Sequence, residues 1–265
     1  KKIKHHYKKF DLSQLLNYRN NQIQNVLIEL NSRNKAIKEV FKVFRPNLII
    51  LNNIRGINYE ITKLSRKYNL NSLVLSHGTI TRGKNKFEKM YQKVISEELV
   101  NNYIEFLGLQ TKFIKSSLKT IQYKNKTIET GNIIFAQSAN KDKKYFLYAV
   151  TQRDFVNMHF YGVETFYEFY ENLKFIDDAA QKNKLSFVIK LHPNLSKLIN
   201  NLKLSFKNID FSNKPIQKLL SNSIATISFS STAIDDSICS NVPVVLFDPW
   251  SRYNHNFYKK NNKAL

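Results

Sequence analysis

The amino-acid sequence predicts an α/β protein with two Rossmann-like domains, each built around a parallel sheet. Short apolar runs typical of buried strands alternate with segments whose apolar residues recur at helical spacing. This alternation occurs twice along the chain, and a less regular stretch separates the two series. Because alternating strands and helices form a parallel sheet covered on both faces, we expect an N-terminal domain over residues 1–138 and a C-terminal domain over residues 139–265.

The first series begins with a long segment of helical periodicity that Pro46 ends. Its apolar runs are short, as in strands that a parallel sheet buries on both faces. In order, the predicted elements are a helix over 12–44, a strand over 47–51, a loop over 52–58, a helix over 59–68, a strand over 73–75, a basic loop over 80–89, a helix over 87–107, and short strands and turns over 111–135.

The second series alternates more regularly, and most of its strands end in polar residues. The predicted strands cover 145–150, 187–189, a short stretch around Ile209, 224–228 and 244–247. The predicted helices cover 163–182, about 195–203, 215–221 and a segment that Ser230 or Ser231 caps and that runs to about Ser240. The sequence contains no internal repeat or low-complexity tract.

The charge is large and uneven. The formal net charge is +22, and residues 1–140 hold 25 Lys and Arg against 9 Asp and Glu, whereas residues 141–265 hold 17 against 11. An AT-rich genome would raise Lys, Asn and Ile throughout, which accounts for part of the excess but not for the asymmetry. The basic half therefore indicates an anionic partner: nucleic acid, anionic lipid or an acidic glycan.

The remaining composition predicts the compartment. Cys239 is the single cysteine, so no intrachain disulfide can form, which favours a reducing environment. No apolar run approaches the roughly 18 residues of a membrane span, and the basic start at residues 1–10 lacks the apolar segment of a signal peptide. We expect a cytoplasmic protein whose basic half can hold it peripherally against the anionic inner face of the membrane.

Ser230, Ser231 and Thr232 follow a predicted strand and precede a helix. Hydroxyl groups and free backbone N–H groups at such a junction form a seat for phosphate, although one serine there can simply be a helix cap. Asp235 lies one turn into the same helix. Its carboxylate can accept hydrogen bonds from ribose hydroxyls, or can merely favour the positive end of the helix dipole.

Lys190, His192 and Pro193 stand at the end of another predicted strand, which we expect to neighbour the strand before Ser230. The imidazole can donate to a phosphate, and the proline restrains the loop that carries it. Thr151 and Gln152 follow the strand over 145–150 and are expected at the same edge. A histidine or lysine after a strand is, however, more often structural than catalytic.

The N-terminal half places a second group of polar residues at strand ends. His77 precedes Gly78, whose flexibility allows a sharp turn at the rim of an interdomain cleft. Such a histidine can act as a general base on an alcohol, or can be an ordinary loop residue. Arg55, Asn58 and Arg82 lie in the loops of this half and are candidate acceptor-binding residues.

In this order, Ser76-His77-Gly78, His192-Pro193 and Ser230-Ser231 (or Ser231-Thr232) resemble motifs of the GT-B glycosyltransferases that build bacterial surface polysaccharides. The resemblance is to polysialyltransferases and related sialyltransferases, whose His-Pro and Ser-Ser motifs bind the CMP moiety of the donor, and the β-Kdo transferases are similar in architecture. Teichoic-acid glycerophosphotransferases are also similar, with an His-Gly in the first domain and an His-Pro in the second.

This resemblance implies a GT-B fold, with the donor bound by the C-terminal domain and the acceptor by the N-terminal one. It implies an inverting transfer of a CMP-activated acidic sugar, such as sialic acid, Kdo or a related nonulosonate, to an anionic or lipid-linked glycan. His192 would then act on the leaving phosphate, with Ser230, Ser231 and Thr232 holding it. The nucleoside would contact Asp235 or the loop after Val150.

The chain also departs from these families. Sialyltransferases of this type often carry an acidic base in the first domain, but Asp11 is the only Asp before Asp142. Glu60, at a strand-to-helix junction, is the better acidic candidate, and it can equally be a glutamate that stabilises the start of its helix. The base therefore stays open between Glu60 and His77. No Asp-X-Asp motif is present, so we expect no metal and no other cofactor.

Three other functions remain open at this point. The chain could be a CDP-glycerol glycerophosphotransferase-like polymerase, or a UDP-sugar 2-epimerase, which shares the GT-B fold and needs no acceptor. It could also bind nucleic acid, since residues 7–10 mix aromatic and basic side chains. The sequence has no recognisable nucleic-acid module, so we expect no specific nucleic-acid partner.

Overall fold

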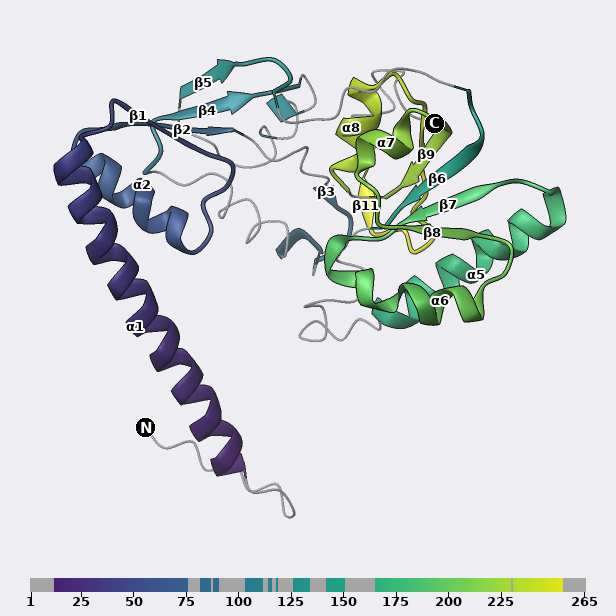
Figure 1. The fold of residues 1–265 in the computed structure, drawn as a ribbon, viewed down its shortest axis with the longest axis horizontal. Helices are drawn as coiled ribbons and strands as arrows, with labels where there is room; N and C mark the ends of the chain where they lie inside the picture. Colours follow the sequence, from purple (N-terminus) through teal and green to yellow (C-terminus); the bar gives the residue numbers. More distant parts are fainter. Residues whose placement is uncertain are drawn as a thin grey trace.

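The computed structural model divides the chain into two lobes, each built around its own parallel sheet (Figure 1). The lobes are formed by successive halves of the sequence, as the alternating pattern predicts. The predicted boundary after residue 138 lies outside the described part of the chain and stays a prediction. The structure describes residues 12–75, 82–86, 88–90, 103–111, 114–115, 118, 126–133, 142–150, 165–229 and 231–254.

The N-terminal lobe holds a four-stranded sheet in the order β1-β2-β4-β5, with every neighbouring pair parallel. Its strands are β1 (Leu48–Leu51), β2 (Asn71–Leu75), β4 (Phe106–Leu109) and β5 (Lys126–Glu129). Helix α2 (Ile57–Lys67) connects β1 to β2 and packs on β2 and on the long helix α1 (Leu12–Phe44). A core that includes Val74, Leu107 and Leu109 lies on this sheet.

The C-terminal lobe holds a five-stranded parallel sheet in the order β10-β9-β6-β7-β8. Its strands are β6 (Tyr145–Ala149), β7 (Phe187–Lys190), β8 (Asp210–Ser212), β9 (Ser223–Ser228) and β10 (Val244–Leu246). Its helices are α5 (Thr165–Asn183), the 3-10 helix η3 (Pro193–Leu198), α6 (Ile199–Ser205), α7 (Ile216–Leu220) and α8 (Ala233–Cys239).

Both faces of the five-stranded sheet are buried. Tyr148 and Ile189 pack on one face against α5 and α6, whereas Leu147 and Val188 pack on the other against α7. Successive strand residues point to opposite faces, so adjacent apolar residues serve two separate cores. Helix α5 covers the sheet with one face, whose buried residues recur every three or four positions: Phe169, Leu173, Ile176 and Ala180.

A third, two-stranded sheet brings distant parts of the chain together. β3 (Arg82–Gly83) and β11 (Tyr253–Asn254) pair in antiparallel register, and both lie between the lobes in Figure 1. A Cβ on Gly83 would lie 2.5 Å from the Cβ of Glu88, so only glycine fits there. On α8, Cys239 packs against the N-terminal core and adds a second contact between the halves.

Arg252 holds this junction in place. Its guanidinium forms one ion pair with Glu88, at 3.2 Å, and another with Glu168 of α5. The Glu88 side chain is only 2% exposed and that of Arg252 is 13% exposed. The Asp248 carboxylate accepts hydrogen bonds from the backbone N–H groups of Arg252 and Tyr253. The cluster therefore joins the 82–90 segment, α5 and the end of the described chain.

Helix α1 is 33 residues long and extends away from the N-terminal lobe (Figure 1). Near its carboxyl end Phe41 is buried and meets the Tyr68 ring edge-on. Further toward the amino end, Leu16, Ile23 and Leu27 are more than half exposed. Within the described residues, no helix is long and apolar enough to cross a membrane.

Most predicted elements are present within a few residues, but two expectations in the N-terminal half were wrong. The helix predicted over 87–107 does not reach its predicted end, because Phe106 and Leu107 belong to β4. Residues 82–83, placed in a loop, form β3, because β11 pairs with them from the far end of the chain. The helix predicted near 195–203 is present, as the 3-10 helix η3 from Pro193 that continues as α6 from Ile199.

Replacing Arg252 with Ala should destabilise the fold strongly, because the buried carboxylate of Glu88 would lose its guanidinium. Breaking a buried ion pair by removing one partner costs about 3–5 kcal/mol, and we expect a loss in this range for the free energy of unfolding in urea. A Lys42→Ala variant removes an exposed partner of Glu39 and should leave stability essentially unchanged. Equal stability of the two variants would contradict this role for Arg252.

Candidate functional site

The carboxyl ends of the strands in both sheets face the region between the lobes. In Figure 1 the arrows of β2 and β4 run toward the C-terminal lobe, and those of β6 and β7 run toward the N-terminal lobe. Since all strands within each large sheet are parallel, the loops that follow them gather at one edge of that sheet. Two loop-lined edges therefore face each other.

At the C-terminal edge, β6 lies between β7 and β9. His192 follows β7 and Ser231 follows β9, so they flank the position where the chain leaves β6. The expectation that β7 and β9 are direct neighbours was wrong, because β6 separates them. The Ser228 hydroxyl donates to the Ala149 carbonyl at 3.2 Å, and this buried bond fixes β9 against the end of β6.

Lys190 is the last residue of β7, and its ammonium group donates to the Leu191 carbonyl at 2.6 Å. Partial burial lowers the pKa of Lys190. Burial also lowers the pKa of the His192 imidazole, and the positive charge of Lys190 lowers it further. His192 is therefore neutral near pH 7, and an approaching phosphate would oppose both effects and favour its protonated, donating form.

The start of α8 is organised by Ser231. Its hydroxyl oxygen accepts the N–H of Ala233 at 3.2 Å, and its carbonyl accepts the N–H of Ile234 at 3.0 Å. Thr232 stands at the N-cap position without a side-chain capping bond. Ser231 and Thr232, two of the three residues predicted to bind phosphate, are both partly exposed to solvent.

Asp235 is almost completely buried, with 1% of its surface exposed. Burial raises the pKa of the Cys239 thiol to about 11, and the carboxylates of Asp235 and Asp236 add to the increase. A thiol with its pKa raised in this way stays protonated near pH 7. The predicted contact of Asp235 with a ribose hydroxyl stays a prediction, and its burial favours a role inside the lobe.

At the N-terminal edge, Asn53 organises the loop between β1 and α2. Its side-chain oxygen accepts the backbone N–H of Arg55 and the side-chain amide of Asn58, each at 3.0 Å. Gly56, at φ +53°, precedes the helix. Arg55 is exposed and Asn58 partly exposed, so both lie at the edge where acceptor binding was predicted.

Glu60, one of the two candidate bases, is occupied within its own lobe. Its carboxylate accepts a hydrogen bond from the Asn34 amide of α1 at 3.0 Å and contacts the Lys63 ammonium at 3.5 Å. These contacts favour a role in packing α2 against α1. Its assignment as a catalytic base stays a prediction.

Several predicted site residues lie outside the described part of the chain. His77, Thr151, Gln152 and Ser230 belong to this group, as does the side chain of Arg82, whose backbone pairs with Asn254 in β3. The side chain of Pro193 is exposed at the start of η3. The described residues contain no group of three or more His, Cys, Asp or Glu that could hold a metal ion.

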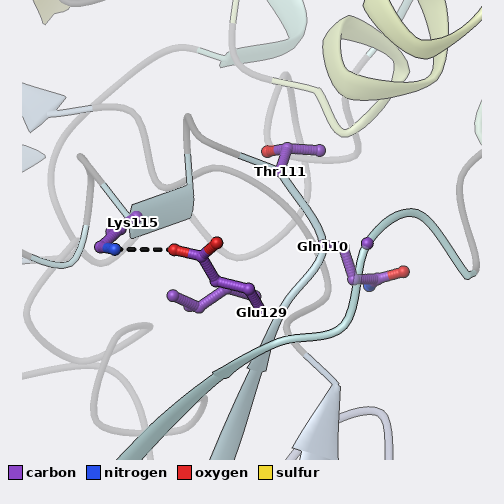
Figure 2. Close-up of a pocket in the computed structure, with 6 residues that line it drawn as sticks. Gln110, Thr111, Lys115 and Glu129 are labelled. Carbon is purple, nitrogen blue, oxygen red and sulfur yellow. Dashed lines mark hydrogen bonds and ion pairs between the residues drawn. The ribbon is translucent and has the colours of Figure 1, made fainter.

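The structure adds a pocket that the sequence did not indicate. It lies at the carboxyl ends of β4 and β5 and has a volume of about 340 Å³ (Figure 2). The described lining residues are Leu109, Gln110, Thr111, Lys115, Glu129 and Gly131. β5 lies in the stretch over 111–135 that was predicted to contain short strands and turns, but it is exposed along its length, so no apolar run located the pocket at its end.

Comparison with solved structures identifies the fold. The two facing lobes with parallel sheets form a GT-B fold, the architecture of both glycosyltransferases and UDP-GlcNAc 2-epimerases. No family model matches the sequence, and no curated protein does. The fold is therefore established through structural similarity alone.

Three of the similar structures illustrate the range. The co-structure of S. aureus MnaA with UDP matches with a TM-score of 0.59 at 13% identity, over 89% of this chain and 65% of that one. The Methanocaldococcus jannaschii UDP-GlcNAc 2-epimerase, in complex with UDP-GlcNAc and UDP, matches with a TM-score of 0.59 at 11% identity, over 89% of this chain and 68% of that one. The glycosyltransferase of kitacinnamycin matches with a TM-score of 0.52 at 12% identity, over 92% of this chain and 68% of that one. The chain thus spans about 65% of the S. aureus protein.

The lowered pKa of His192 predicts a pH dependence of stability. In the unfolded chain the imidazole of His192 takes up a proton near pH 6.5, whereas in the folded chain it does so only at a lower pH. The free energy of unfolding therefore falls as the pH drops from above 6.5 through the folded-state pKa of His192. A His192→Gln variant should lose less stability than the parent between pH 8 and pH 5 in urea titrations. Comparing each protein with its own value at pH 8 removes the constant effect of the substitution. Parallel pH profiles would contradict the prediction.

Proposed function

We propose that this chain is part of a nucleotide-sugar-dependent, metal-independent glycosyltransferase that binds its donor at the carboxyl edge of the five-stranded sheet. The observation that carries the proposal is the placement of His192 and Ser231 on either side of the end of β6. In parallel sheets this edge is the usual place for nucleotides. Similar structures that were solved with UDP or UDP-GlcNAc support the class of donor.

In this proposal the departing nucleotide phosphate is stabilised by the C-terminal lobe. Ser231 and Thr232 supply hydroxyl donors, and His192 supplies an imidazole N–H that becomes positively charged as negative charge develops on the phosphate. The positive charge of Lys190, two residues away, adds to the attraction. The same arrangement suits an inverting displacement, in which a base in the other lobe removes the proton of the acceptor.

For that base we propose His77. The contacts of Glu60 with Asn34 and Lys63 direct its carboxylate toward α1, which makes it the weaker of the two candidates. For the donor we propose a CMP-activated acidic sugar, on the resemblance of His192-Pro193 and Ser230-Ser231 to the motifs of bacterial sialyltransferases. The acceptor would be a glycan held by the N-terminal lobe.

A second candidate function is UDP-sugar 2-epimerisation. It is favoured by the similarity to the M. jannaschii UDP-GlcNAc 2-epimerase, which was solved with UDP-GlcNAc and UDP. The two functions differ in their need for an acceptor. Conversion of UDP-GlcNAc to its 2-epimer in the absence of any acceptor would establish epimerisation and exclude the transfer that we propose.

The first test concerns His192. A His192→Ala variant should turn over donor about 10²–10⁴-fold more slowly, because the leaving phosphate loses its proton or hydrogen-bond donor. Donor turnover would be measured as the nucleotide released when CMP-sialic acid or UDP-GlcNAc is hydrolysed. A Lys197→Ala variant on the exposed face of η3 is the matched control and should retain the parent rate. Near-normal turnover by a folded His192→Ala protein would refute the proposal.

The second test concerns the nucleotide. Among CMP, CDP, UDP and GDP, we expect CMP to raise the melting temperature most. A ligand at 100 times its Kd stabilises a protein by about 2.7 kcal/mol, which corresponds to a shift of roughly 5–10 °C at this size. Selective stabilisation by UDP would instead favour the epimerase, and by CDP a glycerophosphotransferase. A Ser231→Ala variant should reduce whichever shift is observed.

A further inference from the structure

We propose that the pocket at the ends of β4 and β5 binds a single uncharged sugar ring, and that this ring belongs to the acceptor. The role as an acceptor subsite rests on the proposed function, whereas the binding of a neutral sugar does not. The pocket lies at the carboxyl edge of the N-terminal sheet, which faces the predicted donor site of the other lobe (Figure 1). Its described lining includes none of the acceptor-binding residues that the sequence suggested.

The pocket is a built site, because its wall is fixed by hydrogen bonds. Gln110, only 4% exposed, accepts the backbone N–H of Ile133 through its side-chain oxygen at 3.0 Å. Thr130 donates its backbone N–H to the Leu109 carbonyl at 3.1 Å. Together these bonds hold the chain after β5 against the end of β4. A preformed wall of this kind lowers the cost of ordering a ligand.

The shape of the pocket suits one ring. Its volume of about 340 Å³ lies at the lower end of the range of roughly 300–1,000 Å³ for ligand sites. Gly131 lines it in a left-handed conformation at φ +70°, and a Cβ built there would meet no atom within 4 Å. The space beside this backbone is therefore open to a ligand.

The chemistry of the lining favours hydroxyl groups. Lys115 and Glu129 face each other with an Nζ–Oε1 distance of 2.7 Å (Figure 2), and their side chains are 59% and 74% exposed. An exposed ion pair contributes little to stability, so it can share its hydrogen bonds at low cost. An ammonium group donates three hydrogen bonds and a carboxylate accepts about four, which matches the mixed donor and acceptor character of vicinal hydroxyls.

The charge of the pair determines which sugars fit. The ammonium of Lys115 and the carboxylate of Glu129 cancel, so the described lining carries no net charge. A charged ring would find the opposite charge already paired and would also meet the like charge beside it. In a chain of net charge +22, this local neutrality singles out an uncharged ring. Thr111, whose hydroxyl oxygen accepts the N–H of Ile114, adds a further hydroxyl donor.

Three probes with one ring scaffold test the proposal: methyl β-glucopyranoside, methyl β-glucuronide and glucosamine. Each is titrated into the isotopically labelled full chain, and binding is followed at the backbone amides of Gly131 and Ile133. We expect the neutral glucoside to shift these amides and to bind about tenfold or more tightly than either charged probe. Equal affinity for the glucuronide, or no shift with any probe, would overturn the proposal.

Two isosteric variants make the test sharper. Glu129→Gln leaves a positive pocket and should weaken the glucoside while strengthening the glucuronide, and Lys115→Met should reverse the preference toward glucosamine. Matched controls are Glu39→Gln and Lys42→Met, which break a comparable exposed pair on α1 and should change none of the three affinities. Unchanged preferences in the pocket variants would refute the assignment of Lys115 and Glu129.

The two proposals can fail separately. Sugar binding at Gly131 and Ile133 is measured without nucleotide, and nucleotide binding is measured without sugar. If the nucleotides give no thermal shift but the glucoside binds as expected, neutral-sugar binding by the pocket is confirmed and the proposed glycosyltransferase function is refuted. If CMP stabilises the protein and no sugar shifts the pocket amides, the reverse holds.

Discussion

Parallel strand pairing is the constraint on which the rest of this structure depends. Each crossover returns the chain to the same end of its sheet, so every loop that follows a strand lies at one edge. Residues as far apart in sequence as Asn53, Gln110 and Glu129 are brought to one edge in this way, and His192 and Ser231 to another. Because each edge faces the opposite lobe, polar side chains that make no direct contact can still serve a common ligand.

The order of the strands shapes the chemistry within each edge. β6 occupies the centre of its sheet and separates the histidine after β7 from the hydroxyl residues after β9. A phosphate between them would be approached from two sides, which restricts its orientation more than a single loop could. In the N-terminal sheet, β4 and β5 leave room for a pocket, since among the described residues no further strand pairs with β5.

The sequence predicted the elements whose stability depends on their own residues. Apolar runs such as Phe187-Val188-Ile189 identified the buried strands, and helical spacing identified α1 and α5. It could not predict β3 and β11, which are two residues long and exist only because each pairs with the other. The contact of Glu60 with Asn34 and the burial of Asp235 also depend on tertiary packing. The residue types suggested catalytic and binding roles for these carboxylates, but only the structure shows which neighbours they have.

The junction around Arg252 has a consequence for how the protein is made. Glu88 and Arg252 are separated by 164 residues, so the 82–90 segment cannot reach its final position until Arg252 has left the ribosome. At about 5–20 residues per second, this delay is on the order of ten seconds or more. During that time the N-terminal sheet can form, but the segment that joins it to the other lobe cannot dock. We therefore expect the ion pair that joins the two lobes to form only after nearly the whole described chain has been synthesised.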